Sequence, residues 1–346
     1  MLSVSAILHA VADEYTGNIK DLHIKICIGQ DVESSVSNGF EAYQLVGDLP
    51  NFSFEDIDTS CELFKKRLSI PLIISPMTGG GKESLRINKN LAEAAQRSSI
   101  AMAVGSQAIM LKHPETVSSF YVRDVAPDIL LFANLGLVHL NYWLDVQGCL
   151  KAVESIEADG LIFYLNPLQE VFQKGGMRNF EGLLDKLEGL CETFPYPVIV
   201  KEVGFGLSTS ILMELKETGI SAVDVGGRGG TDWARVESFL NKGSRSRLFD
   251  EFGISTSEGL RAAVEIMPKK VSVFASGGIR TGVDMAKAFA MGAKCIGMGL
   301  PFLRWAYQSA DKVVEAVHKL YEELRISMWY AGAKDVEGLS GKIEEK

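Results

Sequence analysis

Two neighbouring apolar segments in the last third of the chain, each followed by a glycine-rich turn, restrict the fold most strongly. The first, residues 271–275, runs into Ser276-Gly277-Gly278-Ile279-Arg280, and the second ends at Gly297-Met298-Gly299-Leu300-Pro301. Glycine lets backbone N–H groups approach an anion with no Cβ in the way, so these turns predict a phosphate site. In a (β/α)8 barrel such a site lies after strands seven and eight. Six earlier strands should then precede it.

Six earlier segments have the length and composition of buried parallel strands. Each is short and almost entirely apolar, as strands covered on both faces are. They are residues 71–75, 100–104, 129–133, 160–164, 197–201 and 222–225. Helical patterns such as 83–98 and 209–218 are long enough for crossovers. We therefore predict an α/β fold, a (β/α)8 TIM barrel with an N-terminal extension. An open doubly wound sheet is the alternative, but its glycine signature would be concentrated at one switch point.

The 346 residues fit one barrel with additions at both ends. We predict an extension at residues 1–60, the barrel at 61–333 and a C-terminal tail at 334–346, with residues 1–18 and the tail frayed. A hydrophobic content of 47% with 23% charged residues is typical of a globular chain. The short basic runs 65–67 and 245–247 are predicted to be solvated loops.

The composition also excludes several classes of protein. A net charge of −9 argues against nucleic-acid binding, which needs a basic face. Five cysteines without metal-binding spacing argue against a disulfide framework, so we expect a cytoplasmic protein. No apolar run reaches the roughly 18 residues that span a bilayer, so we expect no membrane segment.

The predicted strand ends carry amides, hydroxyls and one lysine, which suit a large hydrogen-bonding cofactor. Lys201 closes an apolar strand, where a buried ammonium needs a negative partner. The anionic ring of a reduced flavin would supply one, and an ion pair with Glu202 or another carboxylate is the structural alternative. Gln169 could hold or relay a proton, and Glu170 or Glu237 could bind a hard cation such as Mg²⁺, although such residues are often loop hydrogen-bonders.

Motifs after the strands resemble type 2, FMN-dependent isopentenyl diphosphate isomerase over residues 19–330. The matching segments are Ile74-Ser75-Pro76-Met77-Thr78-Gly79-Gly80, Gly105-Ser106-Gln107, Ala133-Asn134-Leu135-Gly136, Asn166-Pro167-Leu168-Gln169-Glu170, Val200-Lys201-Glu202-Val203-Gly204, Gly229-Gly230-Thr231-Asp232-Trp233 and Gly299-Leu300-Pro301-Phe302. The resemblance implies an oligomeric FMN enzyme that uses reduced flavin and Mg²⁺ to convert isopentenyl diphosphate to dimethylallyl diphosphate. NAD(P)H would only prime the flavin, because the reaction has no net redox change.

The resemblance also implies site residues. The residues that would hold FMN are Met77, Thr78, Ser106, Asn134, Lys201, Thr231, Gly277, Gly278, Arg280, Gly299 and Leu300. Lys20, His23, Asn166, Gln169 and Ser208 would contact a phosphorylated isoprenoid substrate, with His23 a surface residue in the alternative. Glu170 would bind Mg²⁺, and Gln169, Glu237 and Lys201 would act in catalysis.

Three positions depart from the family pattern. Ile19 and Ala108 stand where the family has arginines, and Tyr164 stands where it has a histidine. Since neither isoleucine nor alanine can make an arginine's contacts with phosphate, we expect weaker substrate binding or a different substrate. The alternative function is a divergent FMN-dependent paralogue, an oxidoreductase or tailoring enzyme acting on another unsaturated substrate.

Other FMN or nucleotide barrels are less consistent with the sequence. An α-hydroxy acid oxidase needs a histidine base after strand six, where this chain has Gly226-Gly227-Arg228-Gly229. An inosinate dehydrogenase or guanylate reductase needs a cysteine there, and none is present. A non-catalytic flavin-binding protein would be expected to lack Gln169 and Glu170, which are retained.

Overall fold

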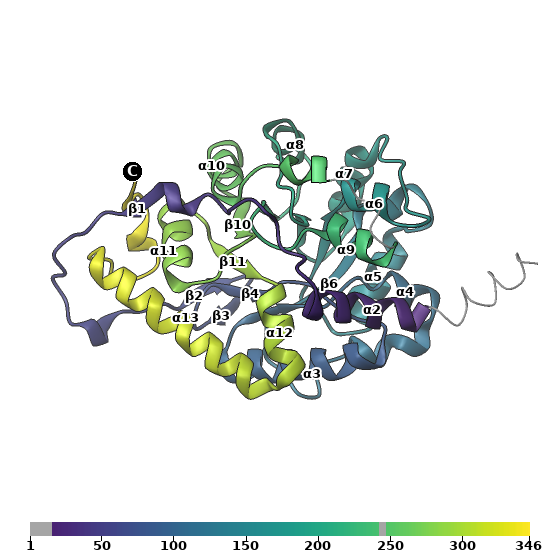
Figure 1. The fold of residues 1–346 in the computed structure, drawn as a ribbon, viewed down its shortest axis with the longest axis horizontal. Coiled ribbons are helices and arrows are strands. Elements are labelled where there is room, and N and C mark those ends of the chain that lie inside the picture. The colour runs from purple at the N-terminus through teal and green to yellow at the C-terminus, as the bar shows by residue number, and fades with distance from the viewer. Residues whose placement is uncertain (1–15, 242–246) are drawn as a thin grey trace, which may run out of the picture.

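The computed structural model describes residues 16–241 and 247–346, and these contain a closed barrel of eight parallel strands (Figure 1). The order around the barrel follows the chain, with the last strand beside the first. The strands are β4 (Leu72–Ile74), β5 (Ala101–Ala103), β6 (Leu131–Gly136), β7 (Gly160–Leu165), β8 (Val198–Glu202), β9 (Ala222–Asp224), β10 (Ser272–Ser276) and β11 (Cys295–Met298). Each of the eight predicted segments forms one strand, which confirms the TIM barrel and excludes the doubly wound sheet.

Helices surround the strands and bury their outer faces. They are α3 (Lys82–Ser98), α4 (Ala108–Lys112), α5 (Val146–Glu154), α6 (Pro167–Phe172), α7 (Leu183–Thr193), α8 (Thr209–Leu215), α9 (Trp233–Leu240), α10 (Thr256–Ile266), α11 (Gly282–Ala290), α12 (Leu300–Gln308) and α13 (Ala310–Tyr330). Short 3-10 turns are η1 (Phe40–Ala42), η2 (Phe54–Asp56), η3 (Pro114–Ser119), η4 (Leu137–Asn141), η5 (Arg247–Glu251) and η6 (Glu337–Leu339). Because both faces of the strands are covered, most of their residues are apolar, and the polar ones, such as Lys201 and Asp224, lie toward the carboxyl ends.

A hairpin before the barrel closes its lower end, the end at which the strands begin. It is formed by β2 (Cys61–Leu63) and β3 (Lys66–Leu68), joined by Phe64 and Lys65 at φ 49° and 65°. The Phe64 ring meets Phe132 edge to face, with centroids 5.8 Å apart. Leu63 and Leu68 join the core inside the barrel. Lys65 and Arg67 are exposed, as predicted for the basic run 65–67, but residues 66 and 67 lie in β3 and not in a loop. The basic run 245–247 lies largely outside the described residues.

The segment before the barrel, the N-terminal arm, pairs with the C-terminal tail on the surface of the barrel. The arm begins with α2 (Thr16–Gly29), and β1 (Tyr43–Leu45) pairs antiparallel with β12 (Ile343–Glu345) (Figure 1). Leu339 in the tail is fully buried. The prediction of a frayed C-terminal tail is therefore wrong. The predicted fraying at residues 1–18 lies outside the described residues for 1–15 and is wrong for 16–18, which belong to α2. The segment boundaries at 60 and 333 stay predictions.

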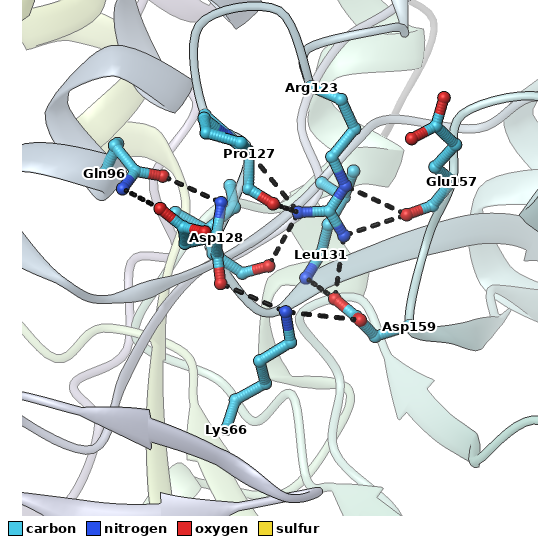
Figure 2. A network of polar contacts seen from close by, with 10 residues as sticks. Lys66, Gln96, Arg123, Pro127, Asp128, Leu131, Glu157 and Asp159 are labelled. Carbon is cyan, nitrogen blue, oxygen red and sulfur yellow. Dashed lines mark hydrogen bonds and ion pairs between the residues drawn. The ribbon is translucent and has the colours of Figure 1, made fainter.

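A polar network joins the loops at the lower end (Figure 2). Arg123, which is 9% exposed, donates to the carbonyls of Ile129 at 2.8 Å and Glu157 at 2.8 Å. It also pairs with Asp159 at 2.8 Å, whose other oxygen lies 3.7 Å from Lys66 Nζ. Because Arg123 is paired with a carboxylate and with backbone acceptors, its charge is compensated inside the protein.

Candidate active site

A cavity of about 1130 Å³ opens at the carboxyl ends of the barrel strands. Catalytic groups of TIM barrels lie at this end, because the loops after the strands converge there. The predicted site residues that line it are Lys20, His23, Met77, Thr78, Ser106, Asn134, Asn166, Gln169, Glu170, Lys201, Thr231, Glu237, Gly277, Gly278, Arg280, Gly299 and Leu300. Residues from nine separate chain segments therefore meet in one space. Ser208 lies elsewhere, since its hydroxyl accepts from Ile211 N–H and caps α8.

Two glycine turns form a cradle on one side of the cavity. Gly277 and Gly278 have φ of 108° and 75°, and an added Cβ would come within 2.0 Å of Gly227 O and 2.4 Å of Gly229 O. Helix α12 starts nearby with Gly299 at its N-cap and no side-chain cap, so its first N–H groups are left for another acceptor. This arrangement fits the phosphate of FMN. The Arg280 guanidinium is held by Glu33 of the arm at 2.8 Å, although the side chain also lines the cavity.

Lys201 lies in the cavity with its charge balanced by the protein. Its ammonium is 3.1 Å from Asp224 Oδ2 and donates to Ser276 Oγ at 2.6 Å. The structural alternative for Lys201, an ion pair with a carboxylate, is therefore present, and the partner is Asp224. The adjacent Glu202 instead accepts from Gly204 N–H at 2.7 Å, and burial raises the pKa of Glu202 to about 7. Lys201 is 8% exposed, so the network holds its ammonium in place at the cavity wall.

Hydroxyl and amide groups at the ends of β4, β5 and β6 also line the cavity. Thr78 Oγ1 is 2.7 Å from Ser84 Oγ. In the amide orientation that satisfies both neighbours, Asn134 donates to Ile162 O at 3.2 Å and accepts from Ser106 N–H at 3.3 Å. These contacts fix the orientation of the side chains. The fixed polar groups suit hydrogen bonding to the edge of a flat polar ring bound in the cavity.

A chain of hydrogen bonds runs across the cavity from Glu170 to the arm. Asn166 Nδ2 donates to Glu170 Oε1 at 2.9 Å and to Gln169 Oε1 at 3.1 Å. Gln169 Nε2 then donates to Glu237 Oε1 at 2.9 Å, and His23 Nε2 is 3.2 Å from the same oxygen. Glu237 is only 2% exposed. The chain can hold a proton next to a bound molecule, and it places His23 inside the site and not on the surface.

The residues near Glu170 give an oxygen-rich but incomplete metal site. Glu170 is 4% exposed, and the carbonyl oxygen Oδ1 of Asn166 is buried without a hydrogen-bond partner among the described residues. Within residues 16–241 and 247–346, no group of three or more His, Cys, Asp or Glu side chains could hold a metal by itself. One carboxylate and one amide oxygen fit Mg²⁺ only when substrate oxygens and water complete its shell.

Several lining residues were missed by the sequence analysis. His139 and Trp143 stack with ring centroids 4.9 Å apart, and Lys112 lies over the Trp143 ring at 4.9 Å. Tyr164, noted from the sequence only as a departure from the family pattern, donates its hydroxyl to Ser106 Oγ at 3.0 Å, and burial raises the pKa of Tyr164 to about 12. His139 follows the predicted Asn134-Leu135-Gly136 strand end within one turn, and that position is the signal that was overlooked.

Comparison with known proteins identifies the class. Residues 169–345 match the FMN-dependent dehydrogenase family. An (S)-mandelate dehydrogenase mutant structure superposes with a TM-score of 0.68 at 18% identity, covering 95% of this chain and 98% of that one. A mutant flavocytochrome b2 gives 0.67 at 19% identity, covering 89% and 77%. These structures show a shared fold. Together with the cradle, the family match defines the protein as an FMN-dependent TIM-barrel flavoprotein.

Closer relatives narrow the class to one family. An isopentenyl-diphosphate delta-isomerase from a Nostoc strain is 40% identical over 330 residues, covering 93% of this chain and 94% of its own. That of a Synechococcus strain is 45% identical over 315 residues, covering 88% and 89%. The chain therefore belongs to the FMN-dependent isopentenyl-diphosphate delta-isomerase family. Of the helices in the described residues, none has the length and apolar character to cross a bilayer.

Proposed function

We propose that this protein converts isopentenyl diphosphate to dimethylallyl diphosphate with FMN as its cofactor. The observation that carries the proposal is the hydrogen-bonded chain Gln169, Glu237 and His23 in the same cavity as the glycine cradle. An isomerase that moves a double bond must add one proton and remove another, and a buried carboxylate linked to polar side chains suits that task. The names of the relatives, which match almost the whole chain, support the same activity.

The residues of the cavity suggest how FMN is held. Gly277, Gly278, Gly299 and Leu300 would bind its phosphate, since their backbones line the turns. Met77, Thr78, Ser106, Asn134 and Thr231 would line the ring, and Lys201 would lie at the pyrimidine edge. When bound and reduced, FMN supplies acid–base chemistry at its ring nitrogens next to the substrate alkene.

The protein's own part is positioning and proton handling. Gln169 is held from both sides, by Asn166 and by Glu237, so its amide can orient the alkene without rotating away. Glu237 can accept a proton and pass it along the contacts with Gln169 or His23. Burial of these groups keeps bulk water from competing for the proton.

Further parts of the proposal concern the metal, the reductant and the assembly. Mg²⁺ would bind between Glu170 and the substrate's phosphate oxygens, which fits a site with a single protein carboxylate. NAD(P)H would reduce the flavin before turnover, and the enzyme would act as a cytoplasmic homo-oligomer. A phosphorylated isoprenoid is the proposed small-molecule partner.

The divergent paralogue is the second candidate, favoured by one contact. Tyr164 stands in place of the family's histidine and donates its hydroxyl to Ser106, so this position supplies no imidazole of its own. Together with Ile19 and Ala108, this change alters three groups that line the cavity. An enzyme acting on another unsaturated substrate would bind FMN stoichiometrically and yet leave isopentenyl diphosphate unchanged.

The deciding experiment incubates the protein with FMN, dithionite, Mg²⁺ and isopentenyl diphosphate and follows dimethylallyl diphosphate. We expect turnover, and we expect Glu237→Gln to reduce kcat by about 100-fold, because the amide cannot take up a proton. Ser208→Ala, a change outside the cavity, is the matched control and should retain kcat. Stoichiometric FMN without turnover would favour the paralogue.

A further inference from the structure

A second group of polar side chains lines the cavity without belonging to the cofactor cradle or to the chain ending at Glu237. Lys20 comes from α2, Lys112 from the end of α4, and His139 and Trp143 from η4 and the residues after it. Their chemistry is uniform, because each is a cation or carries a ring nitrogen. What they bind is not explained by the residues around them.

Two of these side chains have buried polar atoms without partners. His139 Nδ1 and Trp143 Nε1 are both buried and make no hydrogen bond with any described residue. His139 as a whole is 6% exposed and stacks on Trp143. An unsatisfied buried polar atom costs about 1–3 kcal/mol, so two adjacent ones in a cavity wall indicate a bound group that pairs with them.

The cations nearby are also uncompensated. In the described part of the chain, neither Lys20 nor Lys112 forms an ion pair, although Lys112 lies over the Trp143 ring. Both lysines act on the same imidazole, since burial first, and then Lys112 and Lys20, lower the pKa of His139 to about 4. Glu237 attracts Lys20 but is already bound by Gln169 and His23. This contrasts with Lys201, whose charge Asp224 balances.

We infer that Lys20, Lys112, His139 and Trp143 form an anion subsite that takes the phosphate end of the substrate, with Lys112, His139 and Trp143 as its specificity-determining residues. The inference rests on the proposed function, in which the substrate is a diphosphate monoester. The Trp143 N–H and a ring N–H of His139 donate to phosphate oxygens, and the two ammonium groups balance the charge. The Lys112 ammonium lies over the Trp143 ring at 4.9 Å, and this cation–π contact holds it beside the indole N–H.

The test uses inorganic pyrophosphate and FMN-saturated protein, so that the glycine cradle is filled. Pyrophosphate affinity is measured by calorimetry for the wild type and for Lys112→Met, His139→Phe and Trp143→Phe, which keep size or ring and remove charge or ring nitrogen. We expect the first two to weaken binding about tenfold and the third a few-fold. Lys25→Met, on an exposed position of α2, is the matched control and should bind as the wild type does.

Moving the positive charge from position 112 to position 108 should restore pyrophosphate binding. Ala108 lies one turn before Lys112 on α4 and also lines the cavity, so the double variant Lys112→Met/Ala108→Arg returns a cation to the same helix face. We expect it to recover most of the lost pyrophosphate affinity. Tryptophan fluorescence should change on pyrophosphate binding in the wild type, and this change should be lost in Trp143→Phe.

The outcomes separate this inference from the proposed function. Pyrophosphate binding that is equal in the wild type and all three variants would overturn the subsite, even if isopentenyl diphosphate is isomerised. Binding that weakens in the variants and returns in the rescue supports the subsite, even if isopentenyl diphosphate is not turned over. Wild-type protein that binds no pyrophosphate would also overturn it.

Discussion

Positive charge has a protein partner in the Arg123 network at the lower end of the barrel, whereas the lysines of the anion subsite at the mouth of the barrel have none in the described residues. Arg123 is paired with Asp159 and with several backbone carbonyls (Figure 2). Lys20 and Lys112 have no such partners in the described residues, and the ring nitrogens beside them are unsatisfied. A cation satisfied by the protein serves stability, whereas one left unsatisfied costs stability and is retained for a ligand.

The largest expected effect is the loss of folding stability when Arg123 is replaced. Arg123→Met removes the contacts with Ile129, Glu157 and Asp159. The carbonyls of Ile129 and Glu157 lose their donor, whereas Asp159 still accepts from Leu131 N–H at 2.9 Å. We expect the free energy of unfolding, from urea titration, to fall by about 4 kcal/mol. Lys294→Met, which breaks an exposed pair with Glu337, should cost at most about 0.5 kcal/mol. Pyrophosphate affinity of the folded protein should stay unchanged in both. If the Arg123→Met protein is as stable as the wild type, the paired cation does not stabilise the fold and the comparison with the anion subsite fails.

A smaller effect is the dependence of folding stability on pH that arises from His139 in the subsite. The folded pKa of His139 is about 4 against an ordinary 6.5, so the unfolded chain binds a proton in this window that the folded protein does not. Stability from His139 is therefore full above pH 6.5 and falls as the pH drops toward 4, by about 3 kcal/mol in all.

Urea titrations across this pH window check the His139 prediction by comparing wild type with His139→Phe. The variant should lose that part of the pH dependence, and identical slopes would contradict it. Saturating pyrophosphate should reduce the slope in the wild type, because an anion beside the imidazole raises its pKa.

The smallest effect is a gain in stability. Burial lowers the pKa of Lys20, and the opposing attraction of Glu237 does not cancel this effect. Lys20→Met should then raise the free energy of unfolding of the ligand-free protein by about 1 kcal/mol while weakening pyrophosphate binding. Lys25→Met on the same helix should change neither. A loss of stability in Lys20→Met would show that its charge is compensated after all.

The barrel could be predicted from the sequence because its strands are buried on both faces. The segments at 71–75 and 271–275, for example, are mostly apolar and are followed by polar or glycine-rich motifs, and each forms a strand. The phosphate cradle was predictable for a similar reason, since Gly277 and Gly278 stand where a Cβ would collide with the backbone.

Features that depend on distant partners could not be predicted. The hairpin turn uses Phe64 and Lys65 at positive φ, where glycine or asparagine would have been the recognisable signal. The strand β12 exists only through its pairing with β1, about 300 residues away. His139 is carried back to the cavity by η4, after the strand has ended. The role of Glu237 came from family resemblance, because no local pattern marks a buried helical carboxylate as functional.

The pairing of β1 with β12 ties the arm to the far end of the chain. The arm also carries Lys20 and His23 into the cavity, and Glu33, between these two regions, is held by Arg280 and Arg304. A truncation at residue 342, or an affinity tag fused after Lys346, would therefore weaken the pairing that positions the arm. Lys20 and His23, which the arm places in the cavity, would then shift. Changes at the C-terminus that are harmless in many proteins would here alter the geometry of the active-site cavity.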